Sequence, residues 1–158
     1  MQIDEMMIQF SGLELSPGKA AYVKYLFLQE GKVKISGIAG YFNVDPSTVT
    51  RTIHDLAREG YVEHEPYGGV ALTGFGREYG AFLVRRHRIL GLVLSHYGLS
   101  GDQACREASR MESFLSRDAV NKMCRALGHP TKGFCGEICH DPLCLFPPAV
   151  NGLHENVS

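Results

Sequence analysis

Hydrophobic residues recur at steps of three and four between residues 44 and 60, the spacing that places them on one face of an α-helix. These positions are Val49, Ile53, Leu56 and Ala57. Asp45 can cap this helix, Pro46 suits its first turn and Gly60 suits its end. The opposite face is polar and carries Ser47, Thr48, Thr50, Arg51, Thr52, Asp55 and Arg58. The segment is therefore predicted to be an amphipathic helix with one face available to a partner.

The segments on either side of this helix predict a winged helix-turn-helix. Residues 33–42 have the apolar spacing of a short helix, and a turn of only a few residues, 43–45, separates the two helices. Residues 61–64 and 70–72 alternate between apolar and polar positions on either side of a Pro/Gly turn, which predicts a two-stranded hairpin. Helix, turn, helix and hairpin in this order are typical of a winged helix, whose second helix enters a DNA groove.

Further helices are predicted before and after this domain. A helix over residues 16–29 precedes it, and a long helix over residues 74–97, capped by Thr73, follows the hairpin. Two shorter helices follow at residues 100–111 and 116–127. The long helix leaves one domain and enters the next, so it is a natural spine for a dimer.

The predicted fold class is therefore mainly α with a small β-hairpin. We expect an N-terminal arm at residues 1–15, the winged helix at 16–73 and a helical domain at 74–127. Residues 128–150 form a loop rich in Cys and His, and residues 151–158 a flexible tail.

Composition and charge restrict where a partner can bind. The formal net charge of the 158 residues is −1, but basic residues outnumber acidic ones between residues 16 and 90, so DNA binding is expected on a local, weakly basic face. There is no apolar run long enough to span a membrane. Residues 1–15 lack the basic start and apolar core of an export signal. We therefore expect a cytoplasmic protein.

The DNA contacts are expected on the polar face of the second helix and beside it. Ser47, Thr50 and Arg51 lie near the start of that helix, where side chains reach base edges, and arginine can donate two hydrogen bonds to guanine. The side chains expected to contact phosphates are Lys34, Thr48 and Arg58.

The five cysteines all lie outside the winged helix, at Cys105, Cys124, Cys135, Cys139 and Cys144. An odd number in a chain without an export signal favours thiols or metal ligands over a disulfide framework. Three of them, with His140, fall within ten residues of a loop rich in Gly and Pro, which predicts a zinc or iron–sulfur centre formed by Cys135, Cys139, His140 and Cys144.

The spacing of this group, Cys-x3-Cys-x4-Cys, matches neither the usual zinc-binding pair nor the common ferredoxin pattern. His140, His129 or Cys124 can supply the fourth ligand. Two further interpretations remain open: a reversible thiol switch without a metal, and cysteines with a purely structural role.

Several segments together resemble the diphtheria-toxin-repressor and manganese-transport-regulator family of metal-dependent transcription factors. The resemblance covers roughly residues 16–127 and is carried by Ser16-Pro17, Asp45 to Thr50, the hairpin from Gly60 to Thr73, Gly76-Arg77, Arg86-His87-Arg88 and Glu107 to Glu112. It implies a winged-helix domain followed by a helical dimerisation and metal-binding domain. It also implies that metal binding gives the homodimer its DNA-competent shape. At 158 residues, we expect this chain to lack the C-terminal SH3-like barrel that some members carry.

The resemblance implies an interhelical metal site, which this chain keeps only in part. His87 and Glu112 match ligand positions of the family, and Cys105 stands where iron-type members have a histidine. Other ligand positions have changed, to Ala21, Lys24, Gly91, Ser109 and Ser113. A remaining site of His87, Cys105 and Glu112 favours zinc or ferrous iron over manganese. The alternative is that His87 is a hydrogen-bonded core histidine and Cys105 a small core residue.

The function expected first is a homodimeric regulator, most simply a repressor, that binds a palindromic DNA operator and depends on iron or another metal. Sensing is expected to have moved to the C-terminal cysteine group. The alternative is a redox or iron–sulfur-carrying protein that uses its winged helix as a protein-interaction module. An enzyme is not expected, because the sequence has no Gly-rich phosphate loop, Ser-His-Asp set or paired carboxylates.

Overall fold

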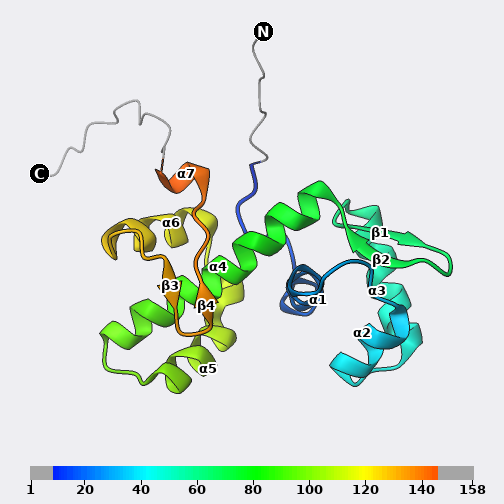
Figure 1. Ribbon diagram of the computed structural model, residues 1–158, viewed down its shortest axis with the longest axis horizontal. Coiled ribbons are helices and arrows are strands. Elements are labelled where there is room, and N and C mark those ends of the chain that lie inside the picture. Colours follow the sequence, from blue (N-terminus) through cyan, green and yellow to red (C-terminus); the bar gives the residue numbers. More distant parts are fainter. Residues whose placement is uncertain (1–8, 146–158) are drawn as a thin grey trace, which may run out of the picture.

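The computed structural model describes residues 9–145 and has two halves joined by one long helix (Figure 1). The first half contains α1 (Pro17–Leu28), α2 (Ile35–Phe42), α3 (Pro46–Arg58), β1 (Val62–Glu65) and β2 (Gly69–Leu72). The long helix is α4 (Gly74–His96). The second half contains α5 (Gly101–Met111), the 3-10 turn η1 (Glu112–Phe114), α6 (Arg117–Ala126), β3 (Lys132–Gly133), β4 (Gly136–Glu137) and α7 (Pro142–Leu145). The mainly α fold with a winged helix and a helical second half is confirmed.

The winged helix has the core that the apolar pattern predicts. Val49, Ile53 and Leu56 of α3 are fully buried and share a core with Ile38 of α2 and Val23 of α1. The helix boundaries also follow the sequence, because α3 begins at a proline and is followed by a glycine with positive φ. One detail of the prediction was wrong: the side chain at position 45 makes no capping hydrogen bond, although its residue is the N-cap.

The wing is an antiparallel hairpin in which Val62 pairs with Leu72 and Glu65 with Gly69. A bridge between Val33 and Val70 attaches the segment before α2 to the hairpin. Tyr67 lies at the tip with a φ of 65° and a fully exposed side chain. The wing therefore extends from the domain while its base is part of the core.

Helix α4 joins the two halves, and its central basic segment contacts several parts of the chain. Arg85 donates to the Asn121 side chain on α6 (2.6 Å), and Arg86 donates to the Gly12 carbonyl (2.9 Å). Arg88 donates to the carbonyl of Glu137 in the β3–β4 hairpin. This segment therefore ties α4 to α6, the N-terminal arm and the hairpin. His87, which lies among these arginines, points to the site described below.

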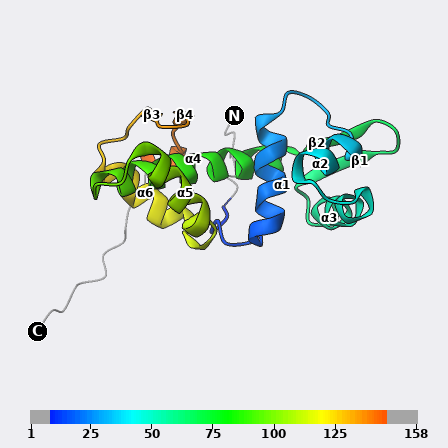
Figure 2. The same cartoon turned by 90° about the horizontal axis from the view of Figure 1, so that it is seen from below.

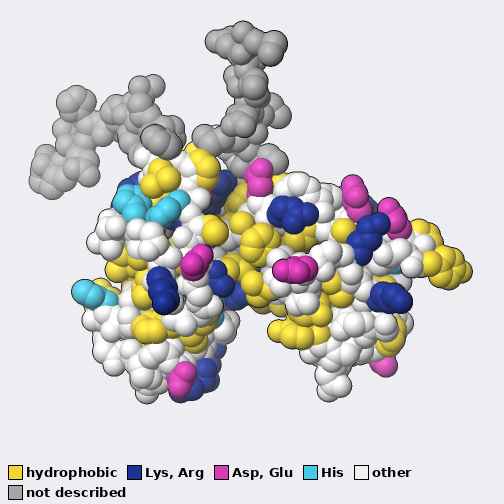
Figure 3. Space-filling model, viewed as in Figure 1, with side chains coloured by type: hydrophobic (Ala, Val, Ile, Leu, Met, Phe, Trp, Pro, Cys, Tyr) yellow, Lys and Arg dark blue, Asp and Glu magenta, His cyan; other side chains and the backbone are white. Residues whose placement is uncertain are grey.

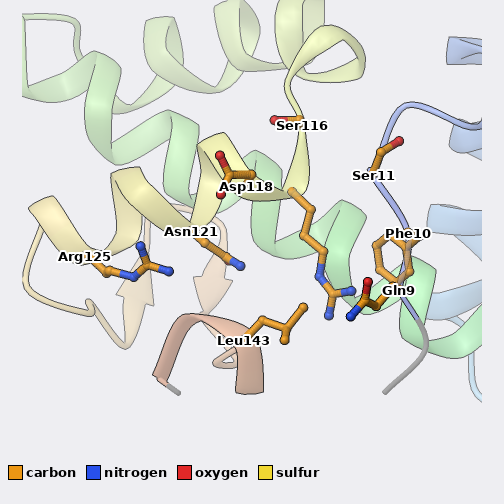
Figure 4. Close-up of a pocket in the computed structure, with 9 residues that line it drawn as sticks. Gln9, Phe10, Ser11, Ser116, Asp118, Asn121, Arg125 and Leu143 are labelled. Carbon is orange, nitrogen blue, oxygen red and sulfur yellow. The ribbon is translucent and has the colours of Figure 1, made fainter. Parts of the chain in front are cut away.

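The last two elements pack on α6. Arg117 forms an ion pair with the buried Asp141 carboxylate, at 2.7 and 3.0 Å, and Asn121 donates to the same carboxylate. Burial raises the pKa of Asp141, but these hydrogen bonds and the charge of Arg117 lower it more, so the carboxylate stays ionised. Figure 4 shows a pocket beside this contact, between α6, Leu143 of α7 and the segment around Phe10.

The described part of the N-terminal arm packs against α4 rather than extending from the protein. Phe10 contacts the rings of Phe75, Tyr79 and Phe82, with centroids 4.8 to 6.2 Å apart. Residues 1–8 of the arm, the end of the Cys/His-rich loop and the predicted tail at 151–158 lie outside the described residues. Within residues 9–145, no helix is long and apolar enough to cross a membrane.

Candidate DNA-binding face and metal centres

The residues predicted to contact DNA share one exposed side of the winged helix. Those on α3 lie on the face opposite its buried residues, and Lys34 lies at the start of α2. The exposed set is Lys34, Ser47, Thr48, Thr50, Arg51 and Arg58. His54 is also exposed, and it continues the line of Ser47 and Arg51 at helical spacing. The sequence pattern contained His54, but our prediction omitted it.

Two of these side chains have partners within the helix. The Thr50 hydroxyl donates to the Pro46 carbonyl (2.9 Å), so its proton is already engaged and its oxygen remains available as an acceptor. The Arg58 guanidinium donates to Asp55 (3.1 Å), which holds it near the C-terminal end of α3. Arg51 is the cation near the start of α3. Within residues 9–145, the structure gives it no ion pair.

A possible metal centre lies where α4, α5 and the β3–β4 hairpin meet. The ligand atoms of His87, Cys105 and Cys135 all lie within 4.8 Å of one another. The Cys135 Sγ lies 3.6 Å from His87 Nε2, close to the roughly 3.6 Å expected between a sulfur and a nitrogen on one tetrahedral zinc. His87 is buried and Cys135 is exposed, so this centre, which we call the interhelical centre, is open on one side.

Glu112 is placed behind His87 rather than among the three ligand atoms. Its carboxylate accepts a hydrogen bond from His87 Nδ1 (2.6 Å) and pairs with Lys24 Nζ (3.2 Å). Burial raises the pKa of Glu112, but the hydrogen bond with His87 and the charge of Lys24 lower it more. Because Nδ1 of His87 lies against the Glu112 carboxylate, Nε2 is the ring nitrogen that faces Cys135. Carboxylate–histidine pairs around many zinc ions have the same arrangement.

The two sulfurs of the interhelical centre lie 2.9 Å apart and both belong to free cysteines. A hydrogen bond with Cys135 raises the pKa of Cys105 to about 11, and burial adds to this shift. Without a metal, Cys105 is therefore held as a thiol. Binding of a metal ion would displace this proton.

The residues of the predicted C-terminal cysteine group do not lie together. Cys135 lies beside His87, whereas His140 lies with Cys124 and His129, and Cys144 lies beside His129. Cys139 is exposed and belongs to neither group. The structure thus joins one residue of the predicted loop group to the predicted interhelical group. No spacing in the sequence indicated that Cys135 and His87 are neighbours.

These donor sets distinguish between possible metals. Imidazole and thiolate ligands suit zinc or ferrous iron, whereas manganese prefers oxygen ligands. The usual iron–sulfur clusters need four thiolates, and within residues 9–145 neither group contains more than two cysteines. The arrangement fits single transition-metal ions and does not fit a four-cysteine cluster.

Comparison with known proteins identifies both halves. The family "Iron dependent repressor, N-terminal DNA binding domain" matches residues 15–70, and "Iron dependent repressor, metal binding and dimerisation domain" matches residues 73–139. The HTH-type transcriptional regulator MntR of Geobacillus kaustophilus is 31% identical over 111 residues, which cover 68% of this chain and 79% of the relative. The regulator of the same name from Geobacillus thermodenitrificans is 28% identical over the same shares.

Solved structures agree with these matches. A manganese-dependent transcriptional repressor in complex with manganese has a TM-score of 0.63 at 28% identity, covering 78% of this chain and 63% of that chain. A protein of Sulfolobus solfataricus, SSo2273, shares the fold with a TM-score of 0.67 at 23% identity, covering 78% and 96%. The chain therefore belongs to the iron-dependent repressor family of metal-dependent, DNA-binding transcriptional regulators, and it is not an enzyme.

Proposed function

We propose that this protein is a homodimeric repressor that binds a palindromic operator when zinc or ferrous iron occupies the interhelical centre. The observation that carries the proposal is the position of His87 Nε2, which faces Cys135 Sγ at 3.6 Å within the group that also contains Cys105. Glu112, the hydrogen-bond partner of His87, and Lys24, which pairs with Glu112, complete the site behind the ligands. The similar manganese-dependent repressor supports metal dependence, but the donors of this chain favour a softer metal.

The interhelical centre is placed where it can influence the DNA-binding half. His87 lies on α4, which begins directly after the wing and packs against α1. Lys24, on α1, pairs with the same carboxylate that holds His87. An ion held by His87, Cys105 and Cys135 would link α4, α5 and the hairpin. A change around His87 can therefore alter how the winged helix sits relative to the dimerising half.

The metal dependence can be tested without knowing the natural operator. A duplex is selected from a random pool with the zinc-loaded full chain, and its affinity is then measured with Zn²⁺, with anaerobic Fe²⁺, with Mn²⁺ and with chelator. We expect zinc or iron to tighten binding by about 5- to 150-fold, the usual range of coupling between two sites. Equal affinity in chelator would overturn the proposal, and an equal response to Mn²⁺ would overturn the metal assignment.

Arg51 is expected to read a base, because it is the exposed cation at the start of α3. Arg51→Ala should weaken binding to the selected duplex by roughly 1–3 kcal/mol and relax the preference at one base pair of each half-site. Arg58→Ala is the matched control, since it should weaken binding to all duplexes alike. If Arg51→Ala keeps both the affinity and the sequence preference, the assignment of Arg51 is wrong.

A thiol switch at the interhelical centre is a second candidate, favoured by the short distance between Cys105 and Cys135. Their 2.9 Å separation is less than the roughly 3.7 Å between two thiolates on one zinc ion. Oxidation by a peroxide would take two electrons and two protons from this pair and form a disulfide. Mass mapping after peroxide treatment distinguishes the two functions, since a switch loses metal and DNA affinity together with the appearance of the Cys105–Cys135 bond.

A further inference from the structure

A second group of metal-ligand side chains lies between α6 and α7, apart from the interhelical centre. The ligand atoms of Cys124, His129 and His140 lie within 4.8 Å of one another. Cys144 lies beside this group, because its Sγ lies 3.5 Å from His129 Nδ1. The Sγ of Cys124 lies 3.7 Å from the same nitrogen. Both distances match the roughly 3.6 Å expected between sulfur and nitrogen around one tetrahedral zinc ion.

Local backbone structure brings these four residues together. Cys124 lies in the last turn of α6, and His129 follows the end of the helix with a φ of 53°, its N–H donating to the Cys124 carbonyl (2.9 Å). A histidine in this left-handed conformation is uncommon and reverses the chain so that its ring lies over the helix end. His140 lies just before α7 and Cys144 lies in it, and the ion pair between Arg117 and Asp141 holds this segment against α6.

One atom of the group has no partner. The Nδ1 of His140 is buried and makes no hydrogen bond with any residue that the structure describes. Buried polar side-chain atoms without a partner are rare in folded proteins. The His140 ring lies 6.1 Å from the ring of His129, between centroids, at an angle of 72°. A metal ion between these rings would provide the missing partner.

The group is closed to solvent more completely than the interhelical centre. Cys124 is 0% exposed and Cys144 is 2% exposed, and the two histidines are partly buried. Burial raises the pKa of Cys144, and a hydrogen bond with Cys124 raises it further. On the face seen in Figure 3, histidine side chains gather over α6 near α7. Two buried cysteines together with two partly buried histidines are a typical ligand set of structural zinc.

We propose that Cys124, His129, His140 and Cys144 bind one structural zinc ion, at what we call the α6–α7 centre. The four ligands occupy all tetrahedral positions, so no place is left for a substrate or an exchangeable ligand. A two-iron cluster with two histidines is a poorer fit. Such a cluster has the cysteines on one iron and the histidines on the other, whereas His129 lies about equally far from both sulfurs.

The α6–α7 centre also determines where the hairpin lies. His129 precedes β3 and His140 follows β4, so two ligands of the centre bound the segment that presents Cys135 to His87. A zinc ion would fix both ends of this segment and place Cys135 before any sensing ion binds. This inference rests on the proposed function and adds a second, structural ion to the regulatory ion of the interhelical centre.

The test counts metal ions in the full-length protein and in four variants, by native mass spectrometry after loading with Zn²⁺. His140→Ala and Cys144→Ser are changes in the α6–α7 centre, and Cys135→Ser is a change in the interhelical centre. Cys139→Ser is the control, because Cys139 lies in neither group. We expect His140→Ala and Cys144→Ser each to lose the zinc ion of the α6–α7 centre, Cys135→Ser to lose only the ion of the interhelical centre, and Cys139→Ser to lose none. Retention of every zinc ion by both His140→Ala and Cys144→Ser would overturn the proposal.

A second measurement keeps the result clear if a variant folds poorly. In the Cys135→Ser protein loaded with Co²⁺, the α6–α7 centre should show the intense visible bands and sulfur charge-transfer absorption of tetrahedral cobalt with two thiolates. Absence of these bands would overturn the proposal, whatever the variants of the α6–α7 centre do. The zinc response of DNA binding in Cys135→Ser tests only the proposed regulatory function, whereas the cobalt spectrum tests only the α6–α7 centre. Either proposal can therefore be contradicted while the other stands.

Discussion

The two candidate metal centres lie in the same half of the molecule but differ in exposure and in number of ligands. The interhelical centre has three ligand atoms, one of them on an exposed cysteine, and lies where α4, α5 and the hairpin meet. The α6–α7 centre has four donors, and its two cysteines are fully buried. An open site can exchange its ion with the surroundings, whereas a closed tetrahedral site holds its ion as part of the fold. The comparison indicates one regulatory and one structural ion.

The two centres also differ in how they are connected to the DNA-binding half (Figures 1 and 2). Helix α4 runs from the wing into the second half, and α1 lies beside it. The interhelical centre includes a residue of α4 and is connected through Glu112 to Lys24 of α1. The α6–α7 centre includes no residue of α4 or of the winged helix. Only the interhelical centre therefore has a direct connection to the DNA-binding half.

The largest expected effect is on stability, when the zinc of the α6–α7 centre is removed. His140→Ala should lower the free energy of unfolding measured in excess zinc by about 4 kcal/mol, the value for an ion present at roughly 1,000 times its dissociation constant. For a protein of this size, this corresponds to a fall in Tm of about 10 °C. Scanning calorimetry with and without zinc measures both. An unchanged Tm in His140→Ala would show that the α6–α7 centre holds no structural ion.

The next effect is on regulation, when the interhelical centre loses a ligand. Cys135→Ser should abolish the zinc response of DNA binding, a loss of about 5- to 150-fold in affinity, while Tm in zinc falls by less than in His140→Ala, because the open site holds its ion less tightly. Fluorescence anisotropy with the selected duplex measures the affinity. A Cys135→Ser protein that still responds to zinc would assign sensing to another site, the α6–α7 centre being the first to examine.

A smaller effect, on metal affinity, is expected when Glu112, the hydrogen-bond partner of His87, loses its charge. Glu112→Gln keeps an acceptor for the His87 N–H but removes the negative charge that Lys24 pairs with. Loss of such an outer partner should weaken metal binding at the interhelical centre by about 10- to 100-fold. Competition with a zinc-binding dye in the His140→Ala background isolates this centre. If the affinity does not change, Glu112 serves only the packing of α4 against α1.

The smallest effect is expected for Cys139, which belongs to neither centre. Cys139→Ser should change neither the zinc content nor the zinc response of DNA binding, because the exposed Cys139 side chain lies in neither group. The same native mass spectra and anisotropy titrations apply. Loss of one zinc ion in this variant would show that Cys139 is a ligand. It would favour a single C-terminal cysteine centre and contradict the assignment of two separate centres.

The fold could be predicted well because its signals are local. The apolar spacing of α3, Pro46 at its start and Gly60 at its end depend only on neighbouring residues, and the structure agrees with them. The short β3–β4 pairing and α7 were not predicted, because two-residue strands and a four-residue helix have no periodicity to detect. Their positions come from contacts with α4 and α6, such as the ion pair between Arg117 and Asp141.

The metal ligands were predicted as residue types but not as groups. Loop spacing suggested that Cys135, Cys139 and Cys144 share one centre, because nearby cysteines in a flexible loop can reach one another. In the structure, Arg88 binds the carbonyls of Cys135 and Glu137, and this contact places the hairpin beside α4. Residues ten positions apart or fewer in the chain therefore lie in different groups.

The sequence alone determined the winged helix, the exposed polar face of α3 and the resemblance to a metal-dependent regulator, because these depend on local periodicity and on motifs. Only the tertiary structure decided that Cys135 joins His87 and Cys105, that Glu112 lies behind His87, and that Cys144 lies beside His129 of the group with Cys124 and His140. A metal centre needs ligand atoms within a few ångströms of one point. The folding of distant segments onto α4 and α6 produces that proximity, and no spacing along the chain specifies it.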